Sequence, residues 1–290
     1  RMDQPTLNTS EPSPLSSEEG RMVPLPYLSA EEADPLSADP FVLVARNAIE
    51  FCRWLAIEST ALQWIQVENL LDEPEAWATA ARKGNDVAID VIVSDPASQY
   101  AAIYRLVDVR NVRPVRVTIP VVEGFLKSLR LAISVHLPVR LLPGQPGPEA
   151  IGELEEALEY YLHDPMVEVP VEFFHSMLAL ARGGSGPELW VATEQDPDVF
   201  ALPDWTLPKD VGFVDQHIAR LVEAGAECAT CSWKVVCRGY FKVPDPEYSC
   251  AGIIPLFDRI GRAGAEMKKD LAAYGSTNKA ATEGSIDENS

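Results

Sequence analysis

The sequence predicts an α/β protein in which a partial, open βα barrel-like domain is followed by a small cysteine-rich domain. Three observations support this prediction. Apolar, strand-like runs alternate with amphipathic helices over residues 39–183, as expected for a parallel sheet with right-handed crossovers. A Gly-Gly-Ser-Gly-Pro stretch at residues 183–187 marks a boundary. Four of the five cysteines then fall between residues 228 and 250.

The first half of the barrel-like domain is predicted from residue 41 onward. Residues 41–58 contain Phe51, Trp54 and Leu55 and are predicted as a helix, and residues 62–67 (LQWIQV) as a short strand. A helix is predicted over 74–82, because Pro74 stands early in it, where a missing N–H costs least. The β-branched run at 87–93 (VAIDVIV) predicts a buried strand. A helix over 97–109 follows.

The second half continues the alternation. Residues 115–119 (VRVTI) predict a strand, 123–135 a helix and 138–142 a strand. The clearest helix spans 148–162, where Ile151, Leu154, Leu158, Tyr161 and Leu162 form one apolar face. Residues 167–174 are the last strand candidate. Four or five βα units are too few for a closed eightfold barrel, so the sheet is expected to be open.

Composition sets the remaining boundaries. Residues 1–38 are rich in Ser, Pro, Glu and Asp and predict a disordered leader, and the polar residues 275–290 predict a disordered tail. The cysteine-rich domain is predicted over 188–274. It ends in a helix with Ile253, Leu256, Phe257 and Ile260 on one face.

The formal net charge of −20 limits the classes of partner. Such a surface repels phosphate backbones, which argues against nucleic acid as a partner, and it favours either a basic partner or simple solubility. No apolar run reaches the roughly 18–20 residues that span a bilayer, so no membrane segment is expected. A secretory signal is not recognised either. We therefore expect a cytoplasmic protein with reduced thiols.

The cysteines have the spacing C-x2-C-x5-C-x12-C, formed by Cys228, Cys231, Cys237 and Cys250. Four thiolates brought close together suit a tetrahedral Zn²⁺ or an iron–sulfur cluster. The chain has an odd number of cysteines, and four of them are clustered. This favours a metal or cluster site over a disulfide framework, which remains an alternative. Zinc ribbons usually have two C-x2-C pairs, and this chain has one. That difference favours iron–sulfur, with zinc left open.

These residues resemble the SPASM domain of radical S-adenosylmethionine (radical SAM) peptide maturases. The resemblance covers residues 188–265 and includes Glu188-Leu189-Trp190, the acidic stretch at 194–198 and the Pro-Asp-Pro before Cys250. It is weaker over 60–180, where the βα units are similar to half of a radical SAM partial barrel. The resemblance implies that Cys228, Cys231, Cys237 and Cys250 hold one auxiliary [4Fe–4S] cluster.

The chain departs from this family at its catalytic motif. Radical SAM enzymes hold the cluster that activates S-adenosylmethionine with C-x3-C-x2-C after the first strand, and the motif is missing from this sequence. The family's additional cysteine corresponds to Phe241, and the cysteines of the inner auxiliary cluster are missing as well. Cys52, beside Phe51 and Trp54, is interpreted as a small apolar core residue. The chain is therefore interpreted as a degenerate family member.

The leading hypothesis is a non-catalytic partner subunit of a radical SAM enzyme in peptide maturation. It would recruit a precursor peptide or transfer an electron. The alternatives are a zinc-stapled interaction scaffold, a fragment of a longer radical SAM enzyme and a free-standing electron carrier. Whether this chain is itself an enzyme is left open, because it lacks the motif that activates S-adenosylmethionine.

A second candidate site lies at the end of the last predicted strand. There Glu172, His175 and Ser176 are expected either to line a pocket or to be ordinary polar residues at a strand end. The four histidines are scattered. Three tryptophans near the cysteines are expected to pack around the small domain, with a role in binding a partner as the alternative; they are Trp190, Trp205 and Trp233.

Overall fold

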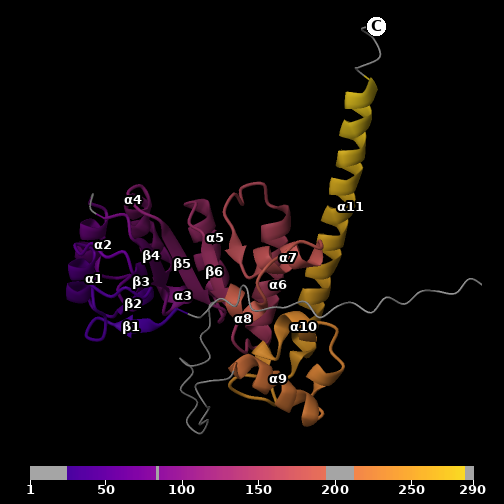
Figure 1. Ribbon diagram of the computed structural model, residues 1–290, viewed down its shortest axis with the longest axis horizontal. Coiled ribbons are helices and arrows are strands. Elements are labelled where there is room, and N and C mark those ends of the chain that lie inside the picture. Colours follow the sequence, from indigo (N-terminus) through magenta and orange to yellow (C-terminus); the bar gives the residue numbers. More distant parts are fainter. Residues whose placement is uncertain (1–24, 83–84, 194–211, 285–290) are drawn as a thin grey trace, which may run out of the picture.

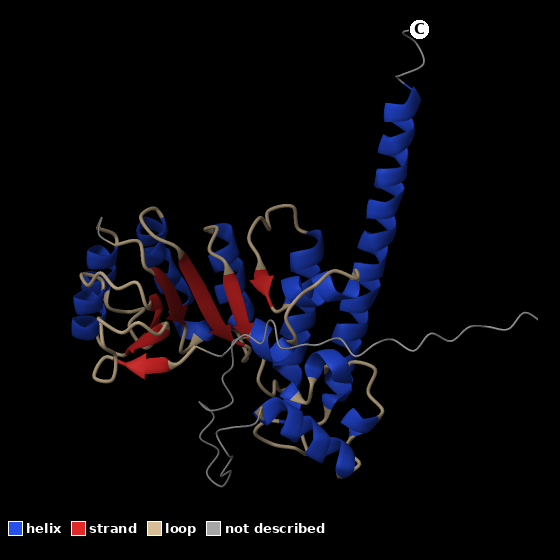
Figure 2. Ribbon diagram, in the orientation of Figure 1, coloured by secondary structure: helices blue, strands red, loops and turns tan. Residues whose placement is uncertain are grey.

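Seven parallel strands form one open sheet whose order follows the chain, β1-β2-β3-β4-β5-β6-β7 (Figures 1 and 2). The computed structural model describes residues 25–82, 85–193 and 212–284. The strands are β1 (Tyr27–Ser29), β2 (Phe41–Ala45), β3 (Leu62–Val67), β4 (Ala88–Ile92), β5 (Val115–Pro120), β6 (Val139–Leu142) and β7 (Val171–Glu172). Because each crossover advances one strand in the same direction, the helices gather on one face of the sheet. The prediction of an open α/β fold is confirmed.

Helices connect the strands and then continue into the C-terminal region. Those of the sheet domain are α1 (Ala48–Trp54), α2 (Pro74–Ala80), α3 (Pro96–Gln99), η1 (Tyr100–Arg105), α4 (Leu106–Arg110), α5 (Phe125–Ser134), α6 (Pro148–His163) and α7 (Phe174–Ala181). Those of the C-terminal region are α8 (Leu189–Ala192), α9 (Phe213–Glu223), η2 (Glu227–Ala229), α10 (Lys234–Cys237), η3 (Tyr240–Lys242), η4 (Cys250–Gly252) and α11 (Ile254–Gly284).

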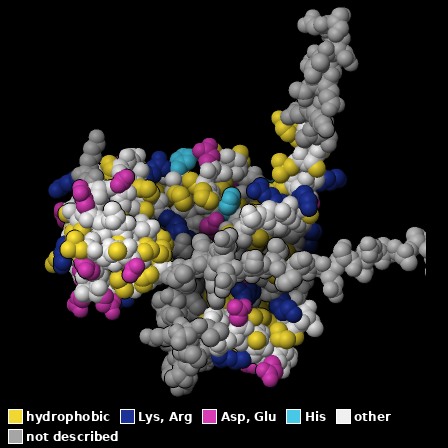
Figure 3. All heavy atoms as spheres, in the orientation of Figure 1, with side chains coloured by type: hydrophobic (Ala, Val, Ile, Leu, Met, Phe, Trp, Pro, Cys, Tyr) yellow, Lys and Arg dark blue, Asp and Glu magenta, His cyan; other side chains and the backbone are white. Residues whose placement is uncertain are grey.

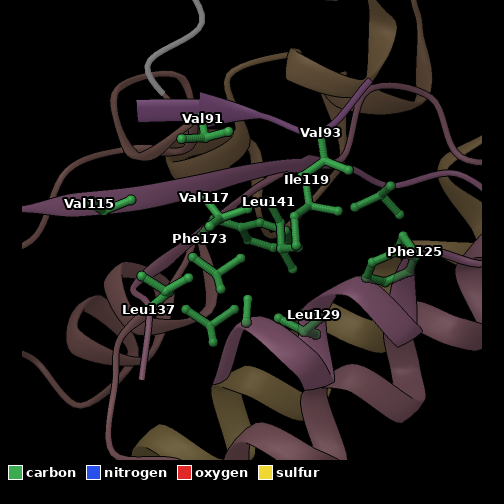
Figure 4. Packing of buried hydrophobic residues seen from close by; sticks show 14 of the residues in the cluster. Val91, Val93, Val115, Val117, Ile119, Phe125, Leu129, Leu137, Leu141 and Phe173 are labelled. Carbon is green, nitrogen blue, oxygen red and sulfur yellow. The ribbon is translucent and has the colours of Figure 1, made fainter. Parts of the chain in front are cut away.

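The main core lies between the sheet and these helices. Figure 4 shows Val117 and Leu141 of the strands facing Phe125 and Leu129 of α5, and all four side chains are fully buried. Burial of each side chain of this size contributes roughly 1.5–3 kcal/mol. Because successive side chains of a strand point to opposite faces of the sheet, one face packs against the helices and the opposite face carries a different set of side chains.

The sequence prediction is wrong for residues 41–45, which form β2 rather than the start of a helix. All five residues of this run, FVLVA, are buried, and a run buried on both faces is typical of a parallel strand. The helix α1 begins only after Asn47, whose side chain accepts a hydrogen bond from the backbone N–H of Glu50 (2.9 Å). That cap defines the true helix start.

Other boundaries also differ from the prediction. The strand predicted over 167–174 is reduced to Val171–Glu172, because the following residues begin α7. The helix predicted over 97–109 is divided into α3, η1 and α4. Strand β1 falls within the predicted leader, whose residues 1–24 lie outside the described part. At the other end, α11 continues to Gly284, past residue 275 where the tail is predicted to begin.

The C-terminal region packs against one end of the sheet domain, with α11 lying beside α7 and projecting beyond it (Figure 1). Gly264 of α11 allows the close approach of the two helices, because a Cβ atom there would lie 2.5 Å from Cβ of Ala181. Among the described helices, none is both long and apolar enough to cross a bilayer.

Candidate metal centre

Four cysteines from separate turns line one small cavity in the C-terminal region. Cys228 lies in η2, Cys231 in the turn after it, Cys237 at the end of α10 and Cys250 at the start of η4. All are free thiols. The fold therefore brings together the four residues predicted as ligands. Cys52, predicted to be buried, is partly buried against the core from α1, and it does not line the cavity.

The cavity is small and mostly apolar. Its volume is about 30 Å³, room for about two water-sized spheres. Beside the thiols, the rings of Trp233, Phe241 and Phe257 form its walls. Within the residues that the structure describes, no group of three or more His, Cys, Asp or Glu side chains is arranged to hold a metal ion. The shared cavity thus gathers the thiols, and metal ligation itself stays a prediction.

Backbone N–H groups surround the sulfur of Cys237. Burial raises the pKa of its thiol to about 11, and the backbone N–H groups of Phe241, Gly239 and Tyr240 act in the opposite direction. The chain can curl in this way because Arg238 and Gly239 both adopt the left-handed conformation, at φ 48° and 80°. Hydrogen bonds of this kind stabilise a thiolate and are one of the means by which proteins tune iron–sulfur clusters.

Gly239 is required at this turn for a second reason. A Cβ atom on it would lie 2.7 Å from Cδ1 of Leu221 and 3.0 Å from Cδ2 of His217. His217 is buried, and its Nε2 donates a hydrogen bond to the carbonyl oxygen of Gly239 (3.0 Å). Burial lowers the pKa of His217. The neutral imidazole therefore fixes the turn that follows Cys237.

The carboxylate of Glu227, which is partly exposed, joins the first cysteine turn to the buried Lys242 and to the last cysteine turn. Nζ of Lys242 lies 2.7 Å from Oε1 of Glu227, and the lysine side chain is only 5% exposed. The same carboxylate accepts a hydrogen bond from the backbone N–H of Cys250 (2.8 Å). Burial raises the pKa of the Cys250 thiol to about 12, with Glu227 adding to the rise and Lys242 opposing it. The ammonium group is thus placed to offset negative charge on thiolates.

The cysteine turns are attached to the sheet domain at the loop that follows β6. The amide nitrogen of Gln145 donates to the carbonyl oxygens of Phe241 (3.0 Å) and Asp245 (2.6 Å). The hydroxyl of Tyr248 donates to the carbonyl oxygen of Pro146 (2.8 Å). The cavity therefore lies near the carboxyl end of β6, on the edge of a parallel sheet where ligands usually bind.

Arg238 connects the cysteine turns to two other parts of the C-terminal region. It forms two hydrogen bonds of 2.8 Å with the carboxylate of Glu188 and an ion pair with Asp215. Trp190 is buried beside these groups, and Trp233 donates from Nε1 to the carboxylate of Asp258 (2.8 Å). Both tryptophans pack around the small domain, as predicted. Trp205 and the acidic stretch at 194–198 lie outside the described residues.

A polar network that no sequence pattern predicted lies on the sheet face opposite the main core. Asp90 of β4 and Arg140 of β6 are both buried and form an ion pair. Thr118 of β5 joins them, donating to Asp90 (2.6 Å) and accepting from Nε of Arg140 (3.0 Å). Arg116 reaches the same carboxylate at 3.1 Å. The sequence signal was the presence of polar residues inside three otherwise apolar strands, one in β4, two in β5 and one in β6.

The environment of Asp90 sets its charge state. Burial by itself would raise the pKa of the carboxyl, but the guanidinium groups of Arg140 and Arg116, with a hydrogen bond from Thr118, hold it below its usual value. The carboxylate therefore stays ionised, and the network joins three neighbouring strands through charge-assisted hydrogen bonds.

The second predicted site does not form. His175 lies in the first turn of α7, where Nδ1 is 3.1 Å from the hydroxyl of Tyr161. Glu172 accepts a hydrogen bond from the backbone N–H of Ser176 (3.2 Å), and Ser176 is buried. Of the three predicted residues, only His175 lines a groove. Because α7 begins at Phe174, His175 and Ser176 are successive helix positions, and their side chains point in different directions, His175 toward solvent and Ser176 into the interior.

Comparison of the chain with models of protein families, with curated proteins and with solved structures finds no match.

Proposed function

We propose that this chain is a degenerate relative of SPASM-type radical SAM peptide maturases that binds one [4Fe–4S] cluster. The ligands are Cys228, Cys231, Cys237 and Cys250, and the protein acts as a non-catalytic partner subunit. The observation that carries the proposal is the shared cavity into which four separate turns bring these cysteines. Four thiolates are the usual ligand set of such a cluster.

The surroundings of the cavity support this assignment. The buried Lys242 offsets part of the charge that four thiolates carry, and N–H groups beside Cys237 stabilise its thiolate form. Phe241 occupies the position of the family's additional cysteine and is buried, 1% exposed, as an apolar wall of the cavity. An apolar wall and hydrogen bonds to sulfur are both known determinants of cluster potential.

A bound cluster would supply one-electron transfer. This chain's own residues hold and orient the ligands and attach them, through Gln145, to the end of β6. We assign no catalytic step to the chain. Its proposed role is to dock against an active radical SAM enzyme and to present a precursor peptide to it or exchange an electron with it.

A zinc-stapled interaction scaffold is the second candidate. It is favoured by the volume of the cavity, about 30 Å³, because a single ion needs less room than four irons and four sulfides. In that case the metal would contribute folding free energy and no redox chemistry.

Metal analysis separates the two candidates. The full chain is produced anaerobically with iron, and iron, sulfide and zinc per chain are measured beside visible and spin-resonance spectra. The proposal predicts about four irons and four sulfides, lost when Cys231 and Cys237 are both changed to Ala. One zinc without visible absorption would support the scaffold instead. A chain that bound neither would contradict both candidates.

A partner assay tests the second half of the proposal. The iron-loaded chain is mixed with a purified SPASM-type radical SAM maturase, and the complex is measured by sedimentation. Failure to bind any such enzyme, with the cluster present, would reject the role as a partner subunit while leaving the cluster assignment intact.

A further inference from the structure

The long helix α11, with Ile253 just before it, carries a seam of apolar and small residues at alternating spacings of four and three. The seam comprises Ile253, Phe257, Ile260, Gly264, Met267, Leu271 and Tyr274. Its first part is buried against the sheet domain, whereas Met267, Leu271 and Tyr274 are 38%, 60% and 69% exposed. This spacing is the pattern by which one helix packs along another. The second part of the seam therefore has the residue pattern of a helix–helix contact, but no described element of this chain packs against it as the sheet domain packs against the first part.

The exposed seam is continuous with a groove beside α7. The groove has a volume of about 470 Å³, within the range of roughly 300–1,000 Å³ for ligand pockets. Leu178 and Ala179 of α7 line it, Leu162 and Val167 line it from the end of α6 and the segment before β7, and Met267 of α11 belongs to both groove and seam. Figure 3 shows hydrophobic side chains along the projecting part of α11 and Lys and Arg side chains at its base.

Cations border this surface on the side of α7. Arg182 lines the groove, and Nζ of Lys268 lies 3.2 Å from the position that a Cβ atom on Gly183 would take. Neither cation is in an ion pair with another described residue. The one acidic residue that lines the groove, Glu168, lies 3.5 Å from Nδ1 of His136. In a chain of net charge −20, this edge is locally basic.

The charges that border the groove and the seam indicate which kind of partner segment would bind there. Screening confines the pull of exposed charges to about 8 Å at physiological salt, so the local cations outweigh the distant acidic surface. An acidic edge on the occupant would face Arg182 and Lys268. Asp270 borders the other edge of the seam, and there an acidic residue would be repelled.

A second copy of this chain fits the surface poorly. The exposed seam from Met267 to Tyr274 is about 10 Å long at 1.5 Å per residue, far less than the three to four heptads of a stable coiled coil. Residues 275–284 (GSTNKAATEG) include no large apolar residue with which to extend it. A stable dimer needs about 800 Å² from each partner, more than so short a seam offers.

We propose that the seam and the groove form a docking site for an amphipathic helical segment of a partner protein. Aliphatic side chains of that segment pack on Met267, Leu271 and Tyr274, and acidic side chains along one edge meet Arg182 and Lys268. This is the mode in which a helix lies in a hydrophobic groove. The inference goes beyond the proposed function, because it holds whether the cysteines bind a cluster, zinc or neither.

The probes are two fluorescein-labelled synthetic helices of about 20 residues. Both carry the same leucine seam, and they have either Glu or Lys along one edge. Binding to the full chain is followed by fluorescence anisotropy. We expect the Glu peptide to bind at least about tenfold more tightly than the Lys peptide, a difference that added salt reduces.

Two variants locate the binding. Leu271→Asp, at an exposed position that the fold does not need, is expected to weaken the Glu peptide about tenfold or more. Ile49→Asp is the matched control, because Ile49 is an exposed apolar residue, 83% exposed, on α1 at the far end of the sheet. It should leave binding unchanged. Arg182→Glu is expected to remove or reverse the preference for the Glu peptide.

The inference is overturned if neither peptide binds or if both peptides bind equally. It is also overturned if the Leu271→Asp protein binds the Glu peptide as tightly as the unchanged protein does. Sedimentation supplies one more decisive outcome. A dimer that Leu271→Asp dissociates would show that a second copy occupies the seam, and the peptide docking site would then be rejected.

Discussion

Replacing Gly239 by Ala tests whether the turn after Cys237 holds the cysteine-rich region together. A non-glycine residue at φ 80° costs about 1–2 kcal/mol. The new Cβ would also lie 2.7 Å from Leu221 and 3.0 Å from His217, and overpacking of this kind costs about 1–3 kcal/mol. Together these terms predict a loss of about 2–5 kcal/mol of unfolding free energy.

Two other glycines serve as matched controls. Gly225 also has a positive φ, 72°, but a Cβ atom there would have no neighbour within 4 Å. Gly225→Ala is therefore expected to show only the conformational cost of about 1–2 kcal/mol. Gly152 lies inside α6 with equally open space, so Gly152→Ala should raise stability by about 1 kcal/mol.

The assay is the shift of the unfolding midpoint in urea, measured for all three variants on protein prepared in the same metal state. Metal content per chain is measured in parallel, because the same turn aims N–H groups at the sulfur of Cys237. Equal losses for Gly239→Ala and Gly225→Ala would refute the claim of close packing at this turn. Full metal content in a Gly239→Ala protein of unchanged stability would remove the link between the turn and the site.

Three further outcomes follow from the buried groups. Asp90→Asn leaves the guanidinium of Arg140 without its buried carboxylate and should cost about 3–5 kcal/mol in urea unfolding; a loss below 1 kcal/mol would contradict the importance of the pair. Because the folded pKa of Asp90 lies below its ordinary value of 3.8, its contribution is complete above about pH 4 and is lost as the pH falls further. The stability difference between Asp90→Asn and the unchanged protein should therefore narrow in acid, and a constant difference from pH 7 to pH 3 would refute this assignment. Cys237→Ser should lower the bound metal or cluster per chain, whereas Cys52→Ser should leave it unchanged; equal metal content in both would exclude Cys237 as a ligand.

The strands and helices show where local pattern is sufficient and where it fails. The strand predicted from LQWIQV at 62–67 and the helix predicted from the apolar face around Leu154 are both present, as β3 and α6. The run FVLVA at 41–45 has no period, so sequence alone could not separate a buried strand from a buried helix. Its pairing with β1 and β3 decides the question.

The end of the last strand illustrates a different limit. Residues 167–174 (VEVPVEFF) are the last strand that the sequence predicts. The partner strand β6 pairs with only Val171 and Glu172. The two phenylalanines that follow turn into α7, where both are buried, and Phe173 stacks on Phe257 of α11 at 6.2 Å. A packing partner more than 80 positions away overrides the local preference.

The sequence by itself determined the open α/β fold class and the clustering of four cysteines near one another in the chain. It could do so because the alternation of strands and helices and the spacing of cysteines are local properties of a chain. Tertiary structure alone decided that Asp90, Thr118 and Arg140 meet across three strands. It also decided that Gln145 attaches the cysteine turns to the end of β6 and that the seam of α11 emerges from the core at Met267. These contacts join residues far apart in the chain, and their energies depend on burial and distance, which no local pattern specifies.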